Sequence, residues 1–235
     1  MYRSAALLFL GLLSALAADA PARAPVLVEL FTSEGCSSCP PADQLLGQLD
    51  SRAIVLGEHV DYWDRYGWRD RFSSTAFTVR QENYGKKFHI ESVYTPQMVV
   101  DGAVQFSGAD SRRAVDAIDR AARNPKAKIQ LSRGAAGLDV SVEDSPQSAS
   151  VYLAFVEPEA TTQVGKGENQ GRELHHVAVA RGIRKIGAVK RGGGFQKTVE
   201  LPADSASQRL VVFLQDGGDG DVFGAAMIAT AAAAR

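Results

Sequence analysis

Apolar residues in the first part of the chain form two short continuous runs separated by a segment with helical spacing. The run Val26 to Phe31 predicts a buried strand, and the run 53–60 predicts a second one. Between them, Pro40-Pro41 opens a segment in which apolar residues recur every three to four positions up to Leu49, as in a helix. Strand, helix and strand in this order predict a parallel crossover unit.

The next elements are two helices on either side of a hairpin. Ser73-Ser74 offers an N-cap to a helix that ends near Phe88. Residues 97–100 and 103–107 predict two strands, because the pair Asp101-Gly102 between them is typical of a tight hairpin turn. Residues 110–123 follow as an amphipathic helix.

After Asn124-Pro125 the pattern changes to short alternating segments separated by glycine, proline and charged residues. Strands that recur with turn residues between them are typical of an all-β sandwich. We therefore predict an α/β domain over residues 26–124 and a β-rich, sandwich-like domain over residues 125–230. The predicted strands of the second domain are residues 128–131, 138–142, 151–156, 174–180, 195–201, 210–215 and 222–228.

The N-terminal residues have the pattern of a secretory signal. Arg3 provides the positive charge, 5–13 an apolar run too short to span a bilayer, and Ala15-Leu16-Ala17 a small-residue cleavage site. We expect a signal peptide at 1–17, a linker at 18–25 and export to the periplasm or the medium. No later stretch is apolar enough to predict a membrane span after the signal is removed.

The charges are balanced, with 26 Lys and Arg against 27 Asp and Glu in 235 residues. A neutral chain has no long-range field to attract nucleic acid or an anionic membrane, so we expect neither as a partner. Partner choice then depends on a local site.

The two cysteines, Cys36 and Cys39, carry the candidate chemistry. They lie between the first predicted strand and the start of the first helix, where amide donors and the positive end of a helix stabilise a thiolate. In an exported chain they are also able to form a persistent disulfide. Three interpretations remain open at this point: a redox pair, a structural bridge, and a copper or zinc site that adds His59 as a third ligand. We expect no resident metal or other cofactor.

Two other polar features are given structural interpretations. The segment 61–71 places four aromatic rings among charged residues, which is typical of the edge of a core as well as of a wet cleft. His175 and His176 are adjacent on a predicted strand and therefore point to opposite faces, which argues against joint metal ligation.

The order of these motifs resembles a known fold. A strand, Cys36-Ser37-Ser38-Cys39, a helix, a strand, and Thr95-Pro96 before a hairpin and a last helix together resemble a thioredoxin fold over residues 26–123. The longer run from Glu29 to Asp43 is similar to a bacterial family of secreted thioredoxin-like proteins catalogued as domain of unknown function 1223.

The resemblance implies roles for individual residues. It implies that Cys36 is the attacking thiol, that Cys39 resolves the mixed disulfide, and that Pro96, preceded by Thr95, is a cis-proline facing the cysteines. By the same resemblance Glu29 is a buried acid near the pair, and a solvent-facing Glu29 is the alternative.

The function that follows is an exported thiol-disulfide oxidoreductase whose partners are protein thiols or disulfides. Two alternatives stay open. One is a non-catalytic binding protein, and the other is a soft-metal protein that uses the same cysteines.

Overall fold

The computed structural model describes residues 24–230, and its first three elements follow the predicted order. β1 (Leu27–Thr32) and β2 (Ile54–His59) pair in parallel and are connected through α1 (Pro40–Leu49). α1 begins directly after Cys39, because proline is tolerated in the first turn of a helix, where its missing N–H has no intrahelical partner.

The β3–β4 hairpin (Gln97–Val100 and Val104–Ser107) lies between α2 (Thr75–Lys87) and α3 (Ser111–Ala121). Its turn is formed by Asp101 and Gly102, with φ values of 48° and 62°, as the sequence predicts. A side chain at position 102 would also come within 2.1 Å of the Gly220 carbonyl oxygen, so this position requires glycine.

The second half of the described chain consists of strands. They occur near the predicted segments, but β7 and β8 have 15 and 17 residues, more than twice the predicted lengths. Two short 3-10 turns, η1 (Asp64–Tyr66) and η2 (Ala203–Ser207), lie in loops. The strands are β5 (Lys128–Gly134), β6 (Gly137–Glu143), β7 (Ala149–Gln163), β8 (Glu173–Val189), β9 (Phe195–Val199), β10 (Arg209–Gln215) and β11 (Val222–Ile228).

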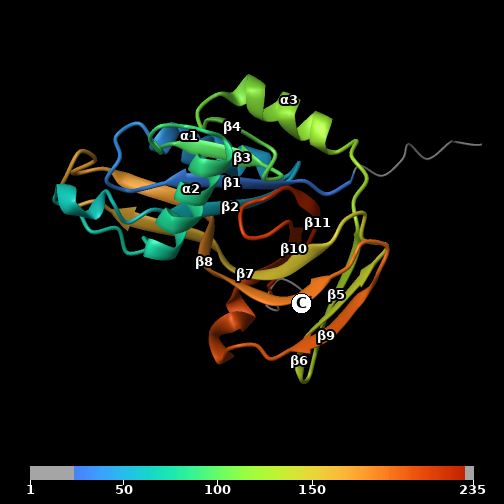
Figure 1. The fold of residues 1–235 in the computed structure, drawn as a ribbon. Coiled ribbons are helices and arrows are strands. Elements are labelled where there is room, and N and C mark those ends of the chain that lie inside the picture. Colours follow the sequence, from blue (N-terminus) through green and yellow to red (C-terminus); the bar gives the residue numbers. More distant parts are fainter. Residues whose placement is uncertain (1–23, 231–235) are drawn as a thin grey trace, which may run out of the picture.

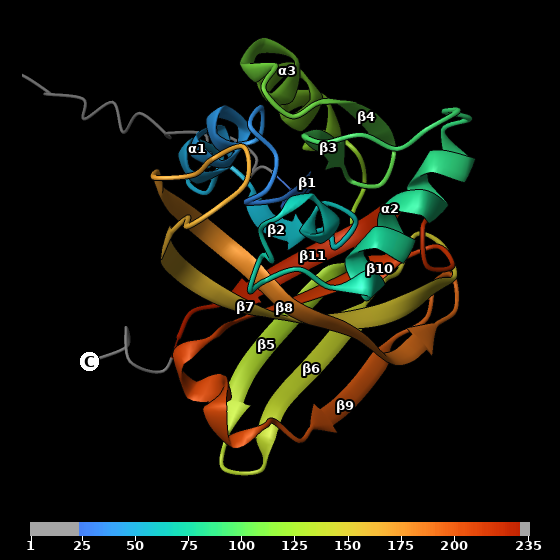
Figure 2. The ribbon, with the colours of Figure 1, turned by 90° about the vertical axis from the view of Figure 1, so that its left-hand side faces the viewer.

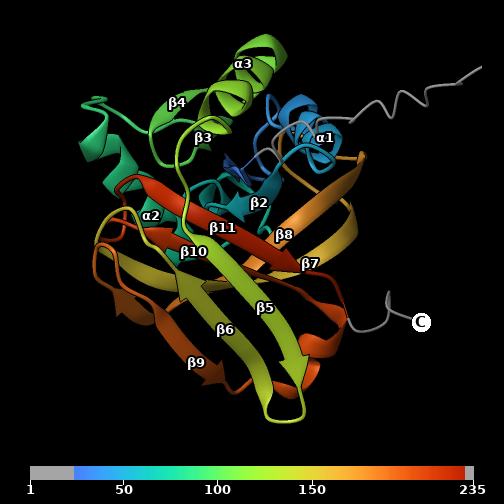
Figure 3. The ribbon, with the colours of Figure 1, turned by 90° about the vertical axis from the view of Figure 1, so that its right-hand side faces the viewer.

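Strands from both halves of the chain form one mixed sheet of eight strands, in the order β11-β10-β7-β8-β2-β1-β3-β4. β8 meets β2 at a single parallel pair, Gly57 and Val179. β5, β6 and β9 form a separate sheet of three strands. In Figures 1 and 2 the long β7–β8 ribbon crosses between the helices of the first half and this small sheet, which Figure 3 shows from the other side.

The predicted fold class, an α/β thioredoxin-like domain followed by a separate β-rich domain, is therefore wrong. The described chain is mostly β, with three α-helices and a sheet that both halves share. The hydrophobic pattern predicts where strands lie but contains no information on which distant strand each one pairs with. The predicted division of the chain into units that begin at residues 26 and 125 stays a prediction.

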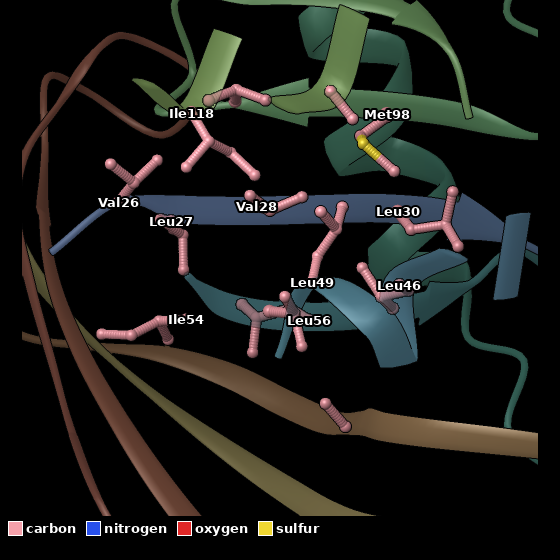
Figure 4. Packing of buried hydrophobic residues seen from close by; sticks show 14 of the residues in the cluster. Val26, Leu27, Val28, Leu30, Leu46, Leu49, Ile54, Leu56, Met98 and Ile118 are labelled. Atoms are coloured by element: carbon pink, nitrogen blue, oxygen red, sulfur yellow. The ribbon is translucent and has the colours of Figure 1, made fainter. Parts of the chain in front are cut away.

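β1 lies in the middle of the larger core because both of its faces are covered. Val28 and Leu30 belong to the apolar cluster that includes α1 and α3, while Phe31 packs on Tyr84 of α2. Figure 4 shows this packing along β1, with Met98 and Ile118 on one side. A second apolar cluster fills the space between the three-stranded sheet and strands β7, β8 and β10 of the large sheet.

The predicted signal peptide at 1–17 and most of the linker at 18–25 lie outside the described residues. Between residues 24 and 230, no helix combines the length and the apolar character that crossing a bilayer requires.

Candidate functional site

Cys36 and Cys39 form a disulfide at the junction of β1 and α1, with their Cα atoms 5.4 Å apart. Cys39 is the N-cap residue of α1 and already has helical backbone angles. Its carbonyl oxygen accepts the backbone N–H of Ala42 at 2.8 Å and of Asp43 at 3.1 Å. One sulfur therefore belongs to a residue at the amino end of a helix, where the helix dipole and free amide groups favour negative charge.

The two cysteines are fully buried, whereas Ser37 and Ser38 between them are exposed. The cover includes residues 164–172, which connect β7 to β8 and which we call the strap. The side chain of Asn169, itself fully buried, donates to the carbonyl oxygens of Glu34 and Cys36, both at 2.9 Å.

A second contact holds the strap at its exposed side. The Ser37 N–H donates to Glu168 Oε2 at 3.0 Å, and the side chain of Ser37, followed by this N–H, lowers the pKa of the Glu168 carboxyl group. Figure 2 shows this end of the β7–β8 hairpin beside α1.

Thr95 and Pro96, joined by a cis peptide bond, lie beside the cysteine loop. Trp63 Nε1 donates to Thr95 Oγ1 at 2.7 Å, and a side chain at Gly35 would come within 3.2 Å of the Trp63 Cβ. Trp63 therefore bridges the residue before Cys36 and the residue before Pro96. The sequence favoured core packing over a cleft for this aromatic segment, and the spacing of its residues contains no signal for the contact with Thr95.

Glu29 is fully buried, so the solvent-facing alternative is wrong. Its carboxylate accepts from Arg80 Nε and from the Tyr84 hydroxyl, both at 2.6 Å. Burial lowers the pKa of Arg80, but the charge of Glu29 outweighs it and keeps the pKa above its ordinary value. The partners of Glu29 are thus on α2.

Glu58 of β2 lies beside this ion pair, and neither of its buried carboxyl oxygens has a hydrogen-bond partner. Burial, followed by the negative charge of Glu29, raises the pKa of Glu58 well above its ordinary value. An acid with a raised pKa in the folded state loses folding stability as pH increases from its unfolded pKa towards its folded pKa.

We therefore expect Glu58→Gln to stabilise the protein at neutral pH by about 1–2 kcal/mol, because glutamine is uncharged in both states and avoids the cost of burying or protonating a carboxylate that is ionised in the unfolded chain. Around pH 4, where the unfolded carboxyl is itself largely protonated, the gain disappears. Urea unfolding at the two pH values measures the difference. A gain that is equal at both values would contradict this account.

Five ionisable side chains form a buried cluster behind the cysteine loop: Glu34, Asp43, His59, Asp70 and His176. His59 Nδ1 lies 2.6 Å from Asp70 Oδ2, and the rings of His59 and His176 meet edge to face with centroids 4.8 Å apart. His176 Nε2 lies 3.4 Å from Glu34 Oε1, and its Nδ1 lies 3.9 Å from Asp43 Oδ2.

The charges within the cluster are set by these neighbours. Burial lowers the pKa of His59, but Asp70 outweighs it and the pKa is raised. Burial raises the pKa of Asp70, but His59 outweighs it and the pKa is lowered. His59 and Asp70 therefore form an ion pair, whereas burial raises the pKa of Asp43 despite the nearby histidines.

The copper or zinc alternative gains no support from this geometry. Both cysteines are in the disulfide, and His59 is paired with Asp70. Within residues 24–230, no group of three or more His, Cys, Asp or Glu side chains is arranged to hold a metal ion. As predicted for a strand, His175 and His176 point to opposite faces, the former exposed and the latter 2% exposed.

A groove of about 530 Å³ opens beside the disulfide, between α1 and the start of β8. Pro40, the residue after Cys39, is at its rim, and Asp43, Arg172 and His175 contribute polar walls. α1 approaches β8 closely at the other end of the groove, where a side chain at Gly47 would come within 2.8 Å of Val177. The groove reaches Pro40 and Asp43 of α1, while both cysteines remain buried beneath the surface.

Comparisons with known proteins agree with the fold. The chain matches the family model described as protein of unknown function (DUF1223) over residues 27–215. It is similar to the crystal structure of protein AGR_C_4864 from Agrobacterium tumefaciens, with a TM-score of 0.77 and 28% identity over 89% of this chain and 96% of that one. HBP35 of Porphyromonas gingivalis has a similar fold, with a TM-score of 0.61 and 12% identity over 89% of this chain and 76% of that one. No curated protein matches the chain.

Proposed function

The chain belongs to the DUF1223 family of proteins of unknown function, and from the setting of its disulfide we propose that it is a thiol-disulfide oxidoreductase acting on protein thiols through Cys36 and Cys39. In this reaction a thiolate attacks one sulfur of a disulfide, and the other sulfur leaves as a thiolate.

The observation that carries the proposal is the placement of a four-residue disulfide loop at the amino end of α1. As a structural bridge it would contribute little, because closing so short a loop constrains the unfolded chain by only about 2 kcal/mol. At a helix amino end, in contrast, a departing thiolate is stabilised by the dipole and by amide donors. The site therefore favours exchange chemistry over a purely structural role.

Burial of both sulfurs means that exchange requires a local opening. The strap is connected to the cysteine loop through Glu168 and Asn169, and the side chain of Glu168 is exposed. Loops with exposed hydrogen bonds open more readily than the core of a domain. We infer that displacement of the strap is the step that admits a partner.

Export to the periplasm or the medium belongs to the same proposal. Disulfides form and persist in oxidising compartments, and residues 1–17 have the pattern of a secretory signal.

Cysteine variants test the proposal. We expect the wild-type protein to accelerate the reduction of insulin disulfides by dithiothreitol, and Cys36→Ser to lose the acceleration completely. Cys39→Ser should retain a mixed disulfide with the substrate on Cys36, because the resolving thiol is absent.

Ser111→Ala is the control, since it makes a serine-to-alanine change at an exposed position of α3, away from the cysteine loop and the strap. Equal rates for wild-type protein and Cys36→Ser would exclude the enzyme and favour a binding role for the groove beside α1.

A further inference from the structure

His176 is buried in an unusual way for a histidine. It is 2% exposed, and neither ring nitrogen has a hydrogen-bond partner. The Oε1 atom of Glu34, 3.4 Å from its Nε2, also has no hydrogen-bond partner. Leaving buried polar atoms unpaired costs about 1–3 kcal/mol each. A side chain retained at that cost, between two carboxyl groups, has another use than packing.

The two carboxyl groups flank the disulfide in the sequence. Glu34 comes two residues before Cys36, and Asp43 comes one helical turn after Cys39. Residues four apart on a helix have Cβ atoms about 5–6 Å apart, and the later side chain leans towards the earlier one. Because Cys39 already has helical backbone angles, positions 39 and 43 are neighbours on the same face of α1.

We propose that Asp43 and His176 form the proton-transfer pair for Cys39 when the disulfide opens and closes, an inference that rests on the proposed function. The chemistry does not depend on Glu29, whose carboxylate is held by Arg80 and Tyr84.

The step is balanced in atoms and electrons. A partner thiolate attacks the Cys36 sulfur, the bond between the two protein sulfurs breaks, and a mixed disulfide forms on Cys36. The electron pair leaves on Cys39, and the Asp43 carboxyl group gives its proton to that thiolate. In the reverse direction the Asp43 carboxylate takes the proton from Cys39, and the resulting thiolate attacks the mixed disulfide.

The surrounding groups suit both states of Asp43. Burial raises the pKa of its carboxyl group above its ordinary value, which favours the protonated form. When it is ionised, His176 faces it at 3.9 Å, and Thr32 Oγ1 donates to its Oδ2 at 3.2 Å. The other charged groups facing the pair are Glu34 from the cysteine loop, His59 from β2 and Asp70 from the segment before α2.

The test is the pH profile of disulfide opening. The rate constant for reduction of Cys36–Cys39 by dithiothreitol is measured across neutral pH and corrected for the thiolate fraction of the reductant. We expect Asp43→Asn to slow the opening at least tenfold at neutral pH and to remove an inflection from the profile, since a positioned acid contributes this much or more. His176→Gln should shift the same inflection.

Two further variants make the result decisive. Asp116→Asn makes the same change as Asp43→Asn at an exposed position of α3 and should retain the wild-type profile. Thr32→Val keeps the shape of a buried side chain but removes the hydrogen bond to the Asp43 carboxylate, so the inflection should move to higher pH. If Asp43→Asn does not fold, the pH profile of Thr32→Val tests the role of Asp43 alone, and an unchanged inflection contradicts that role.

The two proposals fail separately. A wild-type protein that does not exchange with protein disulfides overturns the proposed function. A wild-type protein that exchanges, with the same pH profile in wild type, Asp43→Asn and Thr32→Val, overturns only the role of Asp43 and His176.

Discussion

Asn169→Ala is expected to speed the reduction of the Cys36–Cys39 disulfide by a small thiol about 30- to 100-fold. The Asn169 carboxamide donates to the carbonyl oxygens of Glu34 and Cys36, and the alanine variant leaves both without this donor. Losing these two bonds lowers the free energy of strap opening by about 2–3 kcal/mol. Since 1.4 kcal/mol is a factor of about ten, the population of the open form increases accordingly.

The measurement is the pseudo-first-order rate of thiol appearance under excess dithiothreitol. Gln170→Ala is the matched control, because it removes an exposed amide side chain from the neighbouring position of the same strap. It should be reduced at the wild-type rate. Equal rates for Asn169→Ala and Gln170→Ala would show that the strap does not limit access to the disulfide.

Local elements could be predicted from the sequence because they depend on nearby residues. The apolar run before Cys36, the prolines that open α1 and the Asp101-Gly102 turn each lie in the elements expected for them. The disulfide partners could be predicted for the same reason, since an isolated pair of cysteines three positions apart leaves no other pairing within the chain.

The shared sheet could not be predicted, because its pairing depends on contacts between distant residues. Gly57 and Val179 meet across more than a hundred residues, and neither has a pattern that specifies the other. Residues 157–163, the end of β7 that leads into the strap, are mostly polar and lack the alternation that predicts a strand. These are the parts that position the strap and His176 over the cysteine loop.

Of the residues in the candidate site, only the two cysteines could be assigned their chemistry from the sequence. His176 was considered only as a metal ligand together with His175, because the sequence contains no indication that it faces Glu34 and Asp43. Asp43 did carry a usable signal, since a carboxyl residue one helical turn after Cys39 lies on the same face of the helix. The sequence around Asn169 contains no such signal, because the two carbonyl groups that accept from its side chain are more than 130 positions away along the chain.

The largest loss of stability is expected for Arg80→Met. The guanidinium of Arg80 lies in the core, where it pairs with Glu29 and also donates to the side chain of Gln215 at 3.1 Å. The methionine variant leaves the carboxyl groups of Glu29 and Glu58 buried without a cation. Removing one partner of a buried pair costs about 3–5 kcal/mol, so the melting temperature should decrease by roughly 10 °C or more.

The pH dependence and a second substitution identify the cause of this loss. Arg80 lowers the pKa of the buried Glu58 carboxyl group, so without Arg80 that pKa rises further, and the deficit of the variant should be largest at neutral pH and smaller near pH 4, where the unfolded carboxyl groups are also protonated. Adding Glu29→Gln to Arg80→Met should recover part of the loss, because the double variant no longer buries the unpaired carboxyl group of Glu29. Arg112→Met, at an exposed position of α3, is the control and should unfold like the wild type. The alternative is that the destabilisation of the double variant equals the sum of the two single-variant losses. In that case the two side chains act independently, and the buried ion pair does not stabilise this part of the core.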